Sequence, residues 1–276
     1  MTATLRETDR EQLENAVLRL EFPGFIARVA ELIGAPVERA IQLLPAKAAA
    51  SMGELTQRAV LGSLKAALLT MKPGERHAPL PASSDLWHKA AAALSGGVGG
   101  SLGIAALALE LPVSTTIIMR SIADVARSEG ADLSQLPVQL ECAQVLAFGG
   151  PVPRGDASEA GYFATRASMA RMVVEASAHM AEFGLEREGA PVLVRLILAI
   201  AERYSLPVSA KAAAQLMPAI GAAGGALVNT LFIHHFQDVA RGHFTVRRLE
   251  RTYSPELIRE QYADILQRLR AERIKD

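Results

Sequence analysis

Apolar side chains recur every three or four residues along almost the whole chain, the spacing that places them on one face of an α-helix. The first such stripe contains Leu13, Val17 and Leu20, and Thr8 and Glu11 before it have the spacing of a capping box. Strand-like alternation of apolar and polar positions is missing. The sequence therefore predicts an all-α protein, a single multi-helix bundle with glycine-rich, closely packed central helices.

Residues typical of helix ends divide this pattern into segments. Gly34 and Gly130 follow apolar stripes and predict helix C-termini, whereas Ser254 followed by Pro255 predicts a helix start. The expected helices span residues 25–33, 36–44, 46–71, 113–129, 135–148, 157–183, 190–204 and 209–241, with a break in the last of these at Pro218 and a final helix from 254 onward.

Residues 72–84 contain three prolines and a glycine and form the clearest linker. A helix capped by Ser84 and containing Trp87 is expected to follow it. We expect one helical domain over residues 1–276, with this linker as the place for a sub-boundary.

Charge and composition exclude several classes of protein. The chain has 29 Lys+Arg and 29 Asp+Glu, and such a neutral balance provides no general field for nucleic-acid phosphates. The single cysteine, Cys142, cannot form an internal disulfide, and its apolar surroundings predict a buried, inert thiol. Because residues 1–9 are polar and lack the features of a signal peptide, a cytoplasmic location is expected.

Two long segments carry no formal charge. One spans residues 90–109, between Lys89 and Glu110, and the other follows Lys211 and continues to Asp238. Twenty uncharged residues could span a bilayer of roughly 30 Å as a helix, but the Ala-, Gly- and Ser-rich composition argues against simple spanning helices. Residues 90–109 and 212–233 are therefore interpreted as a buried helix hairpin, with reversible membrane association and genuine insertion as alternatives.

Glycines at four-residue spacing favour the buried hairpin, because they let two helices approach closely. The pairs are Gly96/Gly100, Gly99/Gly103 and Gly221/Gly225. Neither segment has the pattern of a nucleotide-binding loop.

Polar side chains interrupt two of the apolar helices. Arg120 and Asp124 lie four residues apart and can form an ion pair along one helix face. A structural pair is the favoured interpretation, and a site for a polar ligand is the alternative. Arg247, Arg248 and Arg251 form a basic turn, which is interpreted as a solvated face, with anchoring to anionic lipid headgroups as its alternative.

The stretch from Asn229 to Asp238 is the densest polar cluster on an apolar helix. His234 or His235 with Asp238 could supply two metal ligands, and His243 a third. A hydrogen-bonded helix-packing network is favoured instead, with no metal and no cofactor expected. The candidate polar cluster comprises Arg120, Asp124, Asn229, His235, Asp238 and Arg241. Catalytic residues cannot be named from the sequence.

A short internal echo links these two helices. Asp124-Val125-Ala126-Arg127 recurs as Asp238-Val239-Ala240-Arg241, and Thr116 falls in the same register as Thr230. A duplication and a coincidence in an alanine-rich chain both remain open.

The same stretches carry a family resemblance. Residues 110–124 and 235–251, together with Phe22-Pro23-Gly24-Phe25 and Gly161-Tyr162-Phe163-Ala164, resemble the EcsC protein family, and the matches spread over about residues 10–255. The family takes its name from a gene that neighbours an ATP-binding-cassette transporter, and no catalytic residues are defined for it. The resemblance implies a helical, bacterial protein on the cytoplasmic side, with a link to membrane transport or secretion.

Two functions are therefore expected. The first is a non-enzymatic accessory protein that binds a membrane surface or an ABC-transporter component, and so is cytoplasmic and peripherally membrane-associated. The alternative is an enzyme or small-ligand binder with a polar pocket between helices 112–129 and 219–241, whose ligand is unknown.

Overall fold

The computed structural model of the chain describes residues 5–44, 46–70, 99–150, 161–183, 191–216 and 221–273. These residues form helices joined by short connections, and no strand occurs among them, so the predicted all-α bundle is confirmed. The helices are α1 (Glu7–Glu21), α2 (Phe25–Ile33), α3 (Val37–Gln42), α4 (Ala46–Thr70), α6 (Gly99–Ser128), α7 (Leu136–Phe148), α8 (Gly161–Phe183), α9 (Pro191–Leu216), α10 (Gly221–Thr252) and α11 (Pro255–Arg273).

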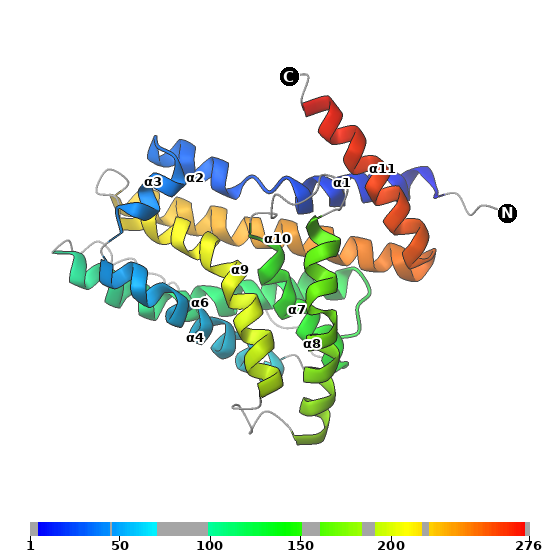
Figure 1. The fold of residues 1–276 in the computed structure, drawn as a ribbon, viewed down its shortest axis with the longest axis horizontal. Coiled ribbons are helices and arrows are strands. Elements are labelled where there is room, and N and C mark those ends of the chain that lie inside the picture. The colour runs from blue at the N-terminus through cyan, green and yellow to red at the C-terminus, as the bar shows by residue number, and fades with distance from the viewer. Residues whose placement is uncertain are drawn as a thin grey trace.

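Helix α10 lies in the middle of the bundle, where it contacts α1, α2, α6, α7, α9 and α11 (Figure 1). Its apolar face carries Phe232, Phe236 and Phe244, and all three rings are fully buried. Phe236 packs edge to face against both Phe232 and Tyr204 of α9. A cluster of aromatic rings therefore fixes α10 against α9 at the centre of the core.

Helix α1 crosses α10 at Gly242, where the two backbones come close together. A Cβ atom on Gly242 would lie 2.8 Å from Leu20 Cγ and 3.2 Å from the Ala16 carbonyl oxygen, so only glycine leaves room for this crossing. Close packing was predicted at Gly225, yet a Cβ placed there has no described atom within 4 Å apart from those of its own stretch of helix. The glycine positions at 96, 99, 100, 103 and 221 lie outside the residues whose surroundings are described.

Several predicted helix ends are confirmed. Helix α2 ends at Gly34 and α6 ends before Gly130, both with the positive φ (66° and 74°) that favours glycine. Ser254 Oγ accepts a hydrogen bond of 3.2 Å from the Leu257 backbone N–H and so caps α11. The capping box at Thr8 is wrong, because α1 begins at Glu7 and Thr8 already lies in its first turn.

Two helices are longer than predicted because they continue through proline. Helix α6 was expected to start at residue 113 but begins at Gly99 and contains Pro112, and α9 passes through Pro207 where a break between 204 and 209 was expected. Thr116 Oγ1 donates to the Pro112 carbonyl at 2.8 Å, and Thr115 Oγ1 donates to the Leu111 carbonyl at 2.7 Å. These hydroxyls add hydrogen bonds around the turn in which proline lacks a backbone N–H donor. Tertiary packing then outweighs the free-energy cost of proline inside a helix.

The linker at 72–84, the expected helix around Trp87 and residues 90–98 of the first uncharged segment lie outside the described residues. Within the described ranges, no helix is both long enough and apolar enough to cross a membrane.

Candidate functional site

The predicted polar cluster is spread along α6 and α10, and its members bond to several different partners. Asp124 pairs with Arg127, at 2.9 Å, and not with Arg120 as expected. Asp238 pairs with Arg241 at 3.1 Å on the same helix. Each carboxylate pairs with the arginine three residues further on, because the i,i+3 spacing keeps both side chains on the partly exposed face of the helix. Arg120 is half-buried, and none of the described residues provides a hydrogen-bond partner for its Nε atom.

His235 of α10 fastens the end of α7. Because a carbonyl oxygen only accepts, His235 Nε2 donates to the Gly149 carbonyl, at 2.8 Å. The imidazole also stacks on Phe25 of α2, with ring centroids 5.2 Å apart. Burial lowers the pKa of His235 to about 4, although the hydrogen bond to Gly149 opposes this shift. A Cβ on Gly149 would overlap the Phe236 ring, so α7 can end here only on glycine.

Side-chain hydrogen bonds join α10 to both α6 and α9. Gln237 Nε2 of α10 donates to Ser121 Oγ of α6 at 2.8 Å. Asn229, a residue of the predicted cluster, accepts from Gln215 Nε2 of α9 at 3.0 Å. The polar pocket expected between residues 112–129 and 219–241 stays a prediction.

The histidine and acidic side chains of α10 point in different directions. His234 is exposed, His235 faces α7, and His243 lies in the core. Across the described part of the chain, no group of three or more His, Cys, Asp or Glu side chains is placed to hold a metal ion.

Sequence reasoning missed the most deeply buried ion pair among the described residues. Lys211 of α9 is fully buried, and its Nζ atom donates to Glu110 Oε1 of α6 at 2.7 Å and to Ser114 Oγ at 3.2 Å. The ammonium also lies 4.7 Å from the centre of the Phe232 ring. Burial lowers the pKa of Lys211, and the attraction of Glu110 opposes that effect. Glu110 Oε2 is buried and has no hydrogen-bond partner among the described residues.

A signal for this pair was present in the sequence. Glu110 is the charge that ends the first uncharged segment, and Lys211 is the charge that begins the second. The ion pair therefore joins the two uncharged segments at their charged boundaries. Its partners are 101 residues apart, and periodicity along one helix carries no information about such a distant contact.

A second buried network surrounds His243. Arg166 Nη1 donates to the Tyr162 hydroxyl at 3.4 Å, and that hydroxyl also shares a hydrogen bond of 2.9 Å with His243 Nδ1. Arg166 also forms two bonds of 2.8 Å with the Glu250 carboxylate. Burial lowers the pKa of His243 well below its usual range, and the nearby Arg166 and Arg247 lower it further. The histidine is therefore neutral, and these bonds tie α8 to α10.

Glu21 extends this network to α1 and α11. Its Oε1 atom accepts bonds from the Tyr262 hydroxyl, at 3.0 Å, and from the Tyr162 backbone N–H, at 3.1 Å. The second bond satisfies a free N–H in the first turn of α8. Burial raises the pKa of Tyr262 well above its usual range.

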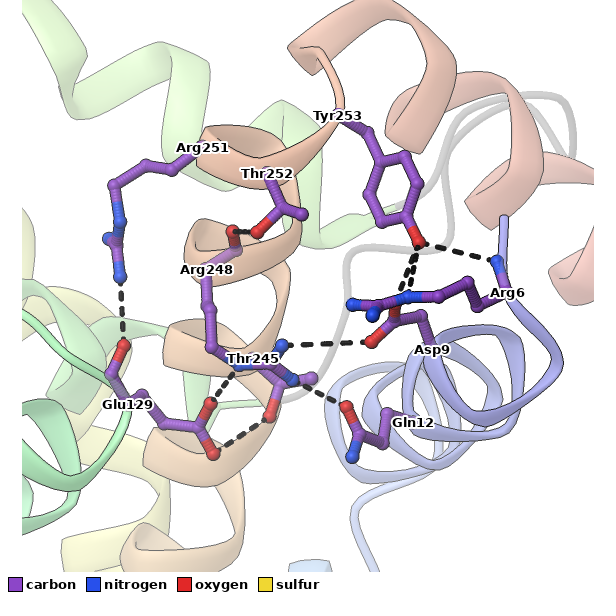
Figure 2. Close-up of polar contacts among 9 residues, drawn as sticks. All are labelled: Arg6, Asp9, Gln12, Glu129, Thr245, Arg248, Arg251, Thr252 and Tyr253. Carbon is purple, nitrogen blue, oxygen red and sulfur yellow. Dashed lines mark hydrogen bonds and ion pairs between the residues drawn. The ribbon is translucent and has the colours of Figure 1, made fainter. Parts of the chain in front are cut away.

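The basic turn at Arg247, Arg248 and Arg251 was interpreted as a solvated face; Arg251 is indeed exposed, but all three arginines also bond to residues of other segments. Figure 2 shows Arg248 reaching from α10 toward Glu129 at the end of α6 and toward Gln12 of α1. Arg248 Nε donates to Glu129 Oε2 at 2.8 Å, and Arg251 donates to the Glu129 carbonyl oxygen at the same distance. Further contacts of this region join Arg247 to Glu141 and Glu250, Asp9 to Arg6, Arg248 and Tyr253, and Thr245 to Glu129.

Cys142 is fully buried in α7, as predicted, and burial raises the pKa of its thiol.

Comparison with known proteins places the chain in a family. The sequence model of the EcsC protein family matches residues 19–249. The chain belongs to the EcsC protein family. Searches of curated proteins and of solved structures found no match.

The stretches that resemble the EcsC family supply most of these ties. Glu110 and Ser114 in the first stretch bind Lys211, and His235 and His243 in the second fasten α7 and α8 to α10. Much of the polar content of the family-like stretches is thus used to hold helices together.

The internal echo also has a counterpart in the structure. Gln237 bonds to Ser121 and Thr245 bonds to Glu129, and the partners are 116 residues apart in both cases. Helices α6 and α10 therefore run parallel, with the same register at both contacts. Thr116 and Thr230 each donate to the carbonyl four residues earlier, so the echoed positions repeat local structure as well as sequence.

The uncharged segments meet at one end of the EcsC fold. Figure 1 shows α3, the first turns of α4, α6 and α10 and the last turns of α9 at the same end, on the left of the view. We call this the uncharged end, defined as Leu43 with residues 46–53, 99–109, 212–216 and 221–233. Lys47 is the one formally charged residue within these ranges. Two large apolar side chains are exposed here, Leu43 (72%) and Leu227 (46%).

Proposed function

We propose that this EcsC-family protein is a non-enzymatic accessory protein that docks by its uncharged end on the cytoplasmic face of a membrane. The observation that carries the proposal is the uncharged end itself. Four helix ends gather there, Lys47 is the one formal charge within their defined ranges, and Leu43 and Leu227 are exposed to solvent; α3, at the same end, adds the exposed Glu38 and Arg39. A concentration of exposed apolar side chains is typical of a surface that binds a membrane or another protein.

The position of Lys47 fits shallow docking. A lysine at the edge of an apolar surface can lay its aliphatic stem along that surface and keep its ammonium group among headgroups. The Glu110–Lys211 pair lies where the uncharged segments stop, so it marks the inner limit of the surface that would contact lipid. We therefore propose peripheral attachment.

The non-enzymatic part of the proposal is supported by how the polar side chains are used. His235, His243 and Glu250 are hydrogen-bonded to other helices and buried, and the Cys142 thiol is enclosed. Action beside a transport or secretion system is the role that the EcsC resemblance implies, and a transporter component is the proposed protein partner.

Vesicle flotation tests the docking. We expect the wild-type chain to float with vesicles of phosphatidylethanolamine and phosphatidylglycerol, and the double variant Leu43→Glu/Leu227→Glu to partition at least about tenfold less, because each glutamate places a charge where apolar area must be buried. Leu198→Glu on α9 is the matched control, since Leu198 is as exposed (42%) as Leu227 but lies outside the uncharged end. It should float like wild type. A wild-type chain that stays with the vesicle-free fractions would contradict the proposal.

A further inference from the structure

Helix α6 is long enough to cross a bilayer, and one charge stands in the middle of the stretch that would do so. Residues 100–119 all lie in α6, and twenty helical residues span roughly 30 Å, the thickness of the hydrocarbon core. Seven of these twenty residues are Leu or Ile, which favour insertion. Glu110 is the only formal charge between Lys89 and Arg120. It is therefore the residue that counts most against insertion of this stretch.

The position of Glu110 makes its charge effective. A charged side chain at the centre of a membrane-spanning helix strongly opposes insertion, and Glu110 is the eleventh of the twenty residues. Its counter-charge arrives late, because Lys211 lies 101 residues further along the chain. At about 5–20 residues per second, the ribosome adds Lys211 roughly 5–20 seconds after Glu110. During that time Glu110 has no Lys211 to pair with.

In the folded core, Lys211 allows the same charge to be buried. Lys211 Nζ donates to Glu110 Oε1 at 2.7 Å and to Ser114 Oγ at 3.2 Å, and both members of the ion pair are buried. These bonds hold α6 against α9, while α6 also packs against α4 and α10.

Stability alone does not require the ion pair. An apolar pair of similar volume is often equally stable in a protein interior. The pair is also incompletely bonded, since Glu110 Oε2 finds no donor among the described residues. A charge that opposes insertion explains what packing leaves unexplained, namely why a carboxylate stands at this position of an apolar helix.

We propose that Glu110 keeps α6 out of the bilayer, and that Lys211 is the counter-charge that allows Glu110 to be buried in the folded protein. Without the charge at position 110, residues 90–119 would form an uninterrupted run of thirty uncharged residues. This inference is independent of docking by the uncharged end. Flotation of the wild-type chain with vesicles tests docking, whereas the variants below test exclusion of α6, so either proposal can fail without the other.

Carbonate extraction of cell membranes tests the exclusion of α6. Full-length wild type and variants are produced in bacterial cells, the membranes are washed with alkaline carbonate, and flotation then separates embedded chains from aggregates. We expect at least about tenfold more of Glu110→Leu/Lys211→Met than of wild type in the carbonate-resistant, floating fraction, because this variant has no charge at the centre of the stretch. Equal amounts of the two chains in that fraction would overturn the proposal.

The single variant Lys211→Met separates insertion from instability. It leaves Glu110 buried without its counter-charge, so it should be less stable than Glu110→Leu/Lys211→Met, but it keeps the charge in α6. We therefore expect it to be as scarce as wild type in the carbonate-resistant, floating fraction. If Lys211→Met floats as much as the double variant, loss of folding and not loss of the α6 charge drives insertion, and the proposal is wrong.

A charge restored elsewhere in α6 tests whether charge is the property that matters. Val113 lies three residues after Glu110 and is half-buried, so Val113→Glu can be added to the double variant without placing the new carboxylate deep in the core. We expect this triple variant to return to the wild-type distribution. Val113→Thr in the same background is the matched control, and it should stay embedded because threonine is uncharged and similar to valine in size. Glutamate and threonine variants that float equally would contradict the proposal.

Discussion

The variant Lys211→Met should lower the free energy of unfolding by about 3–5 kcal/mol, because it leaves a buried carboxylate without its counter-charge. Lys211 is fully buried and donates at 2.7 Å to Glu110, whose other oxygen has no donor within the described part of the chain. With the lysine removed, neither oxygen of Glu110 has a described side-chain donor. Urea denaturation of wild type and variant at neutral pH measures the difference.

Two controls separate the ion pair from a general effect of mutation. The double variant Glu110→Leu/Lys211→Met removes both charges and should recover most of the lost stability, because a buried pair and an apolar pair of similar volume are often equally stable. Removing Arg58, which pairs with Glu54 at the same kind of distance (2.6 Å) but in an exposed position, should cost less than about 1 kcal/mol. If Lys211→Met lowers the free energy of unfolding no more than the Arg58 variant does, the claim that the buried Glu110–Lys211 pair stabilises the interior is wrong.

Stability should fall as the pH is lowered from 7 toward 4.5. His235 has a folded-state pKa of about 4, and that of His243 is also well below the value of 6.5 expected for an unfolded chain. The unfolded chain therefore binds more protons in this window. The contribution of each neutral histidine to the free energy of unfolding is fully present above about pH 7. It is lost as the pH falls through 6.5 toward the folded-state pKa. For His235 alone the loss approaches about 3 kcal/mol.

Denaturant unfolding at several pH values measures this slope. His235→Gln should remove about one proton from the difference between the two states, and so flatten the curve. The matched control is His234→Gln, since His234 neighbours His235 on α10 but is exposed. Stability that stays constant between pH 7 and pH 5 would contradict the account of buried neutral histidines.

The helices were predictable where local chemistry decides them. The positive φ of Gly34 and the cap of Ser254 are properties of a few neighbouring residues, and the sequence pattern indicated both ends correctly. The start of α6 and the end of α9 were not, because a proline is a weak guide to a helix end once packing contributes. Pro112 stands inside α6, and the hydroxyls of Thr115 and Thr116 lie in the turn that follows it.

The polar residues illustrate the same limit. His235 and Asp238 were recognised as unusual on an apolar helix, and a packing role was favoured; in the structure His235 is hydrogen-bonded to Gly149. The partners could not be predicted, because Gly149 and Lys211 are distant in the chain from the residues they bind. A single sequence carries spacing along each helix but no register between helices.

Environment-sensitive fluorescence tests the central claim, docking by the uncharged end, most directly. A dye on Leu227→Cys reports on that end, a dye on Leu198→Cys reports on α9, and the buried Cys142 leaves one reactive thiol in each variant. On addition of phosphatidylethanolamine and phosphatidylglycerol vesicles, we predict a blue shift and protection from iodide quenching at position 227, with no change at 198. Unchanged emission at 227, or an equal shift at 198, would contradict docking by the uncharged end.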